Sequence, residues 1–271
     1  MKRSAIIFLL GALGISAIPA IASTTAFDFT SGAGANGKFN NDNIGNSSPL
    51  EYTLNGITVT ATAYATATKS TSTFSGTPTI GSYSGYGLGV CSAADGSNCP
   101  GNAPQHQIDN SGSYEFILFQ FSTAVNLNSI VLANFGTTAS SIDMDISYWT
   151  NPSTLTAIPA GATYVFCGDT NEGAANQHAC PTGQGSGSGI GANSLTDTLT
   201  GSDVTSLLVG AYTGTTTSPA DNTADYFKIQ ELNVTQSVGG GLNPTPEPAT
   251  FGLIGIALIG LGFARRKRKS E

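Results

Sequence analysis

Residues 57–68 alternate between apolar and polar side chains almost without a break. The apolar positions fall on every second residue, at Ile57, Val59, Ala61, Ala63, Ala65 and Ala67, with mostly threonine between them. A period of two predicts a β-strand with one buried face. The same chain has no amphipathic helical segment longer than two turns, so we expect its folded part to consist of strands.

Other segments have strand-like patterns of their own. Tyr114–Phe121 is apolar at nearly every position, as expected of a central strand covered on both faces. We predict that Leu127–Phe135 follows it after a short turn, and that the remaining strands are 142–148, Thr163–Cys167, Val204–Tyr212 and Tyr226–Val234. Short strands separated by Gly, Asn and Pro are typical of two packed sheets. We therefore predict an all-β, jelly-roll-like β-sandwich over residues 23–236.

The predicted sandwich domain is strongly acidic. Between residues 23 and 245 there are 15 Asp and Glu residues against three lysines, Lys38, Lys69 and Lys228, for a net charge of −12. Such a surface repels polyphosphates, so we expect no nucleic-acid partner. Neutral glycans and divalent cations are compatible with this charge.

The first 22 residues have the pattern of a secretory signal peptide. Lys2 and Arg3 precede an apolar run that continues to about Ile21, and Ala20-Ile21-Ala22 resembles a signal-peptidase site. We expect cleavage after Ala22, with an uncleaved N-terminal anchor as the alternative.

Four cysteines form two local pairs along the chain, and export places them in an oxidising compartment. Four cysteines allow three connectivities. We favour Cys91–Cys99 and Cys167–Cys180, because short loops close most readily. Zinc is the alternative, although neither of the two histidines has the spacing typical of a zinc ligand.

The last 26 residues combine three elements in a fixed order. The acidic tripeptide Pro246-Glu247-Pro248 comes first, and the uncharged apolar run Ala249–Ala264 follows. A basic cluster ends the series, with Arg265, Arg266, Lys267, Arg268 and Lys269. We expect a short C-terminal transmembrane helix whose basic end stays on the cytoplasmic side. Its 16 residues reach roughly 24 Å, less than the usual span, so the bilayer must thin around them. Residues 237–245, rich in glycine, are expected to be a flexible linker.

This tail resembles the PEP-CTERM sorting signal of Gram-negative bacteria. The resemblance implies that exosortase, a transpeptidase-like enzyme of the inner membrane, reads the tripeptide and cleaves near it. The protein would then be released or re-anchored at the cell surface. A permanent membrane anchor without processing is the alternative.

A second resemblance covers residues 56–148. Gly85–Val90, His106–Asn110 and Tyr114–Phe121 occur in the same order as in the exosortase-dependent surface protein family. That family is defined by its sorting, so the resemblance implies a location and no particular chemistry.

We expect no enzymatic activity. The chain has two histidines, His106 and His178, and no G-x-S-x-G nucleophile motif. A glycosidase needs two carboxylates on facing elements, and any acidic sandwich offers such pairs; the candidates here are Asp109, Glu115, Asp143 and Asp145. Tyr83, Tyr86 and Trp149 are either a sugar-stacking platform or core residues, and the core is the commoner place for them.

The segment around Asp109 and Asn110 has two interpretations. In one, their oxygens and that of Glu115 bind Ca²⁺, which prefers hard oxygen ligands in loops. In the other, Asp109 and Asn110 are turn residues that bond their own backbone before the next strand. No other cofactor is expected.

These observations together predict an exported protein that exosortase sorts to the cell surface or the extracellular matrix. We expect a structural or adhesive role within exopolysaccharide, as in a biofilm. The alternative is a secreted, calcium-dependent glycan-binding module, and a secreted hydrolase is third. The expected partners are exosortase, the inner membrane before processing, and extracellular polysaccharide.

Overall fold

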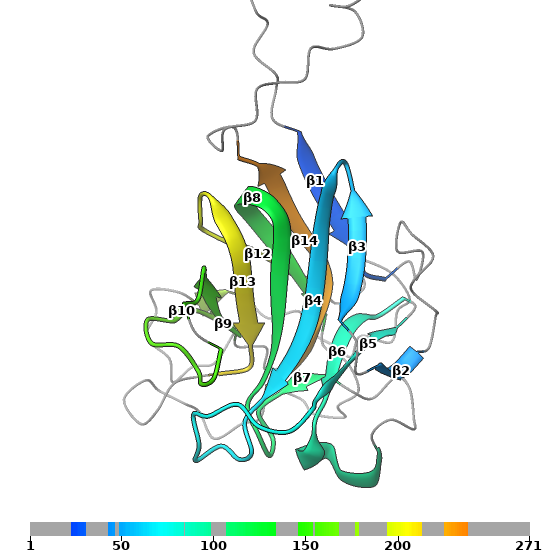
Figure 1. Ribbon diagram of the computed structural model, residues 1–271, viewed down its shortest axis with the longest axis vertical. Helices are drawn as coiled ribbons and strands as arrows, with labels where there is room; N and C mark the ends of the chain where they lie inside the picture. Colours follow the sequence, from blue (N-terminus) through cyan, green and yellow to red (C-terminus); the bar gives the residue numbers. More distant parts are fainter. Residues whose placement is uncertain are drawn as a thin grey trace, which may run out of the picture.

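The computed structural model describes residues 23–30, 43–46, 49–83, 85–98, 107–133, 146–153, 155–167, 177–178, 194–212 and 225–237. These residues are all-β apart from one 3₁₀ helix, η1 (Ala93–Asn98). Their strands join in one 14-stranded sheet (Figure 1). In chain order the strands are β1 (Thr24–Asp28), β2 (Asn43–Asn46), β3 (Leu50–Leu54), β4 (Ile57–Ala65), β5 (Thr79–Tyr83), β6 (Gly87–Cys91), β7 (Ile108–Asp109), β8 (Glu115–Ala133), β9 (Ile146–Thr150), β10 (Thr163–Cys167), β11 (Gln177–His178), β12 (Ser194–Thr198), β13 (Val204–Gly210) and β14 (Tyr226–Gln236).

Strand β8 connects two layers of this sheet. Its first part, Glu115–Phe121, pairs with β4 on one side and β13 on the other. Its second part, Val125–Ala133, pairs with β14 and β12. The register with β13 is irregular between the two parts, and such irregularities bend a strand. The sheet therefore folds back on itself, with β4, β13 and the first part of β8 in front of β14 and β1 in Figure 1.

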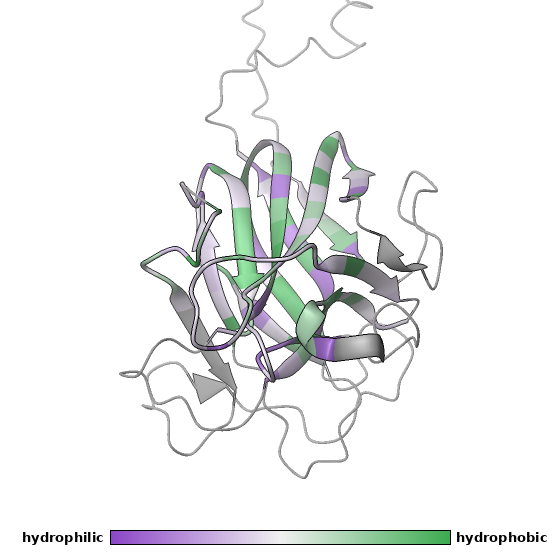
Figure 2. Ribbon diagram, turned by 60° about the horizontal axis from the view of Figure 1, so that its bottom comes forward, coloured by the Kyte–Doolittle hydropathy of each residue, from purple (hydrophilic) through white to green (hydrophobic). Residues whose placement is uncertain are grey.

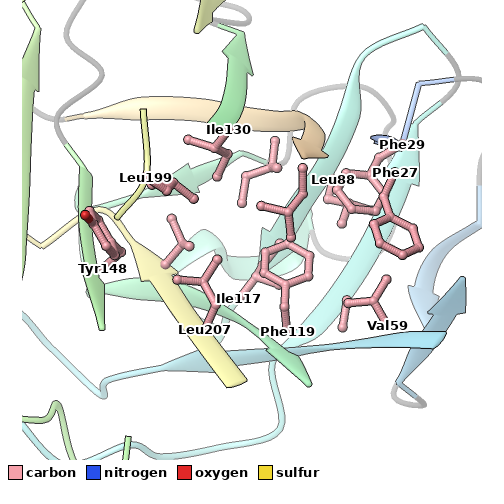
Figure 3. Close-up of a cluster of buried hydrophobic side chains, with 14 of the residues drawn as sticks. Phe27, Phe29, Val59, Leu88, Ile117, Phe119, Ile130, Tyr148, Leu199 and Leu207 are labelled. Carbon is pink, nitrogen blue, oxygen red and sulfur yellow. The ribbon is translucent and has the colours of Figure 1, made fainter. Parts of the chain in front are cut away.

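The main core lies between the two layers. Side chains from β4, the first part of β8 and β13 point toward those of β1, β6 and the second part of β8 (Figure 3). The first layer contributes Val59, Ile117 and Phe119, and the second layer contributes Leu88 and Ile130. Each of these side chains is at most 1% exposed. Figure 2 shows hydrophobic residues concentrated along the central strands. Burial of this apolar surface is the main favourable term in folding.

A second apolar cluster covers the other face of the first part of β8. Phe116 and Trp149 lie 5.9 Å apart between ring centres, and Tyr212 packs 6.0 Å from Trp149. Tyr64 and Phe74 also pack against this cluster. The prediction that Tyr114–Phe121 is covered on both faces is confirmed, because both clusters use residues of this strand.

Two tight connections depend on glycine. Asn55 and Gly56 both have positive φ, at 51° and 78°, in the two-residue turn between β3 and β4. An Asn-Gly pair is favoured in such hairpins because both positions need positive φ. Gly87 has φ 102°, and a Cβ there would overlap the backbone carbonyl of Ile229. Gly87 therefore lets β6 approach β14 closely.

The two ends of β14 lie at opposite ends of the molecule. Thr235 pairs with Thr24, where the described chain begins, and Tyr226 pairs with Asp109 of β7. Eleven residues at about 3.3 Å each cover roughly 35 Å. Figure 1 accordingly draws β7 at the lower end and the end of β14 at the upper end. The segment that leads to the C-terminal tail thus leaves from the end opposite β7.

The predicted all-β class is confirmed, with two corrections. Strands β4, β10, β13 and β14 match predicted strands within a few residues, and β4 alternates between buried and partly exposed positions as expected. The predicted turn between Phe121 and Leu127 is wrong, because β8 runs through it as one strand of 19 residues. The expected two separate sheets are joined into one for the same reason.

Several predictions lie outside the described residues. They concern the signal peptide (1–22), nearly all of the linker (237–245), the sorting tail (246–271), and Cys99, Cys180, His106, Asp143 and Asp145. Among the residues that the structure describes, no helix is long and apolar enough to cross a membrane.

Candidate functional site

Three carboxylates converge near the β7 end of the molecule. Asp95 lies in η1, Asp109 ends β7 and Glu115 begins β8, and one carboxylate oxygen from each lies within 4.8 Å of the others. We call these three residues the acidic cluster. Its members come from three separate elements, so only the folded chain brings them together.

Backbone amides hold each carboxylate in place. Asp95 Oδ2 accepts a hydrogen bond from Ser92 N at 2.7 Å, and Asp109 Oδ1 accepts one from Ser111 N at 2.8 Å. Glu115 Oε2 accepts one from Asp109 N at 3.1 Å. These hydrogen bonds fix the positions of the three carboxylates.

One oxygen of Glu115 has no hydrogen-bond partner among the residues that the structure describes. Its side chain is fully buried, and Oε1 has no hydrogen-bond partner among the described residues. Leaving a buried carboxylate oxygen unsatisfied costs on the order of 1–3 kcal/mol. The cluster thus has a buried acceptor that a positive group would stabilise.

Burial and crowding shift the protonation of the two inner carboxylates. Burial, with the nearby charges of Asp109 and Asp95, raises the pKa of Glu115 well above its usual value. Burial also raises the pKa of Asp109 to about 7, although the Ser111 amide opposes this shift. Removing the water that normally solvates a carboxylate disfavours its charged form, and like charges add to this effect.

A buried lysine lies near the acidic cluster. Lys228, on β14, is fully buried, and its Nζ lies 4.3 Å from the centre of the Tyr83 ring. Burial lowers the pKa of Lys228 to about 7, while Glu115 and Asp109 oppose that shift. A cation above a tyrosine ring is attracted by the ring's electrons, so Tyr83 helps to hold this side chain.

The sequence predicted two of the three cluster residues. Asp109 and Glu115 lie together, whereas Asn110 turns away and donates from Nδ2 to Asp225 Oδ2. Asp109 also bonds the Ser111 amide two residues on, as the turn interpretation required. Asp95 was not predicted as a site residue, because it lies in the stretch between Cys91 and Cys99 that was expected to be a disulfide loop.

The aromatic residues do not form an exposed sugar platform. Tyr83 is 1% exposed and Trp149 is 4% exposed, so both are core residues. Tyr86 is partly buried. The core interpretation of Tyr83 and Trp149 is the correct one.

Two hollows flank the segment Ser75–Pro78. One has a volume of about 470 Å³ and is lined by Thr66, Thr79 and Ser92 among others. The other, about 600 Å³, includes Tyr64 and Phe74. Ser92 links the first hollow to the cluster, because its amide bonds Asp95. The first hollow therefore has some hydroxyl-bearing side chains in its wall, and one of these residues, Ser92, bonds Asp95 of the cluster.

Cys91 ends β6 and is disulfide-bonded. The pairings Cys91–Cys99 and Cys167–Cys180 stay predictions, because the structure does not describe the side chains of Cys99, Cys167 and Cys180.

We expect the exported protein to show no free thiol before reduction, and each bridge to stabilise it by about 2–3 kcal/mol. Alkylation of the native and the reduced protein, followed by mass measurement, checks this. Four alkylated cysteines in the native protein would rule out both bridges.

Comparison with known proteins assigns the C-terminal region. Residues 244–269 match the family model of the PEP-CTERM protein-sorting motif. No curated protein and no solved structure matches the chain. The matched residues include the predicted tripeptide, the apolar run and the basic cluster. The chain therefore carries a PEP-CTERM sorting motif, which implies export and exosortase-dependent sorting to the cell surface or beyond it.

Proposed function

We propose that this protein is a structural or adhesive component of the cell surface or extracellular matrix, held within exopolysaccharide after exosortase has processed it. The observation that carries the proposal is the sorting motif at residues 244–269. A protein with such a motif acts outside the cell, where polysaccharide is the neighbouring polymer. The proposed role includes no catalytic step.

The positions of these features at the two ends of the molecule support this role. The segment toward the sorting motif leaves from the Gln236 end of β14, and the acidic cluster and the two hollows lie toward the other end. An anchored protein would therefore present the β7 end to its surroundings. A rigid all-β body with the sorting motif at one end is suited to displaying a surface.

The proposal predicts that the protein co-purifies with matrix polysaccharide. Exopolysaccharide from the producing bacterium should retain the released protein on sedimentation, and digestion of the polysaccharide should free it. A strain that lacks the gene should assemble less cohesive matrix, measured as biomass that survives shear. Unchanged matrix and a protein found free in the medium would contradict the proposal.

A second candidate is a calcium-dependent glycan-binding module. The observation that favours it is the hollow of about 470 Å³, whose Ser92 contacts the acidic cluster. A bound Ca²⁺ would lie beside hydroxyl-bearing walls that suit a neutral sugar. Glycan-array binding that is lost on chelation and regained with Ca²⁺ would support this candidate, whereas an array without signal would exclude it for the glycans presented.

A further inference from the structure

We propose that Asp95, Asp109 and Glu115 form a binding site for one divalent cation, with Ca²⁺ as the preferred ion. The proposal does not depend on how the protein is sorted or on whether it binds a glycan. The sequence suggested Asp109, Asn110 and Glu115 as ligands, whereas the proposed site contains Asp95 and not Asn110.

The geometry of the carboxylates fits a cation between them. Their oxygens lie within 4.8 Å of one another. Two Ca²⁺–oxygen bonds of about 2.3–2.6 Å bridge oxygens up to about 5 Å apart, whereas two Mg²⁺–oxygen bonds bridge only about 4.2 Å. The spacing of up to 4.8 Å between one oxygen of each residue therefore suits Ca²⁺ better than Mg²⁺.

The unsatisfied oxygen of Glu115 is an independent indication of a ligand. Oε1 is fully buried and has no hydrogen-bond partner among the residues that the structure describes. Buried polar atoms in folded proteins nearly always have a partner, and the exceptions need an explanation. A cation bound at the cluster supplies the missing partner.

Lys228 is the rival source of positive charge. Its Nζ lies 4.3 Å from the centre of the Tyr83 ring. It does not supply a hydrogen bond to Glu115 Oε1, because that oxygen has no hydrogen-bond partner among the described residues.

Solvent reaches the cluster through Asp95, which is only partly buried, so water can complete the six to eight ligands that Ca²⁺ takes.

The test is equilibrium dialysis of the full-length chain in detergent micelles against radioactive Ca²⁺, after treatment with a chelator. We expect one Ca²⁺ per chain with a Kd of about 10⁻⁴–10⁻³ M, as in other extracellular modules. Asp95→Asn keeps the acceptor for the Ser92 amide but removes a charge, and should weaken binding at least about tenfold. Asp109→Asn should act likewise.

The matched control is Glu51→Gln, which removes a charge on β3, opposite Thr60 of β4. It should bind Ca²⁺ as the unaltered chain does, and so should the sorting variant Glu247→Ala. Ca²⁺ should also raise the melting temperature of both controls but not that of Asp95→Asn, with equal circular dichroism showing that all variants fold.

Three results would overturn the proposal. One is the absence of saturable Ca²⁺ binding. Another is binding by Asp95→Asn and Asp109→Asn that equals binding by Glu51→Gln. The third is an equal effect of Na⁺ at matched ionic strength, which would mean general screening of an acidic surface.

Discussion

Replacing Glu247 with alanine is expected to leave the protein as an uncleaved precursor in the inner membrane, with essentially none reaching the medium. The apolar run Ala249–Ala264 and the basic cluster after it are unchanged, so the tail still inserts. The acidic residue between Pro246 and Pro248 is lost, and with it the group that we expect exosortase to read. Fractionation and immunoblotting of cells and medium measure the outcome.

The control for this variant is Glu271→Ala. It removes the same charge from the same tail but lies outside the matched residues 244–269, so release should be normal. Release of the Glu247→Ala protein at normal mass would mean that the tripeptide is not the recognition element.

Replacing Gly87 with alanine is expected to destabilise the folded domain by about 2–4 kcal/mol, a large part of the 5–15 kcal/mol typical of a domain. The new Cβ would overlap the carbonyl of Ile229, and its positive φ of 102° adds backbone strain. The clash separates β6 from β14 where Leu88 and Ile229 pair. Chemical denaturation under oxidising conditions measures the loss.

The variant Gly56→Ala distinguishes the effect of backbone strain from the effect of the steric clash. Gly56 also has positive φ, at 78°, but a Cβ there meets nothing within 4 Å. We expect a loss of about 1–2 kcal/mol from backbone strain alone. If the two variants lost equal stability, the close contact between β6 and β14 would not matter to the fold.

Much of the fold could be predicted because its strands carry local patterns. The alternation from Ile57 gives β4, and the doubly apolar Tyr114–Phe121 marks the central strand. The path of β8 could not be predicted in this way, since Ser122 and Thr123 look like turn residues. Pairing with β14 and β12 keeps the chain extended beyond them, so long-range contacts override the local preference.

The acidic cluster could likewise be predicted only in part, because long-range contacts bring its residues together. Asp109 and Glu115 are six residues apart, so their proximity could be guessed from the sequence. Asp95 lies 14 residues before Asp109 and reaches it only because η1 follows β6, which pairs with β14 beside β7. The burial of Lys228 against the Tyr83 ring likewise depends on tertiary packing. The sequence around Lys228 and around Tyr83 contains no local pattern that indicates this contact.

If this chain is exported and processed at its sorting motif, the intact mass of the released protein will show it. We expect a chain that begins at Ser23 and ends close to Pro246-Glu247-Pro248, without residues 249–271, apart from any group attached at the cleavage site. A released chain that still carries the apolar run and the basic cluster would contradict it.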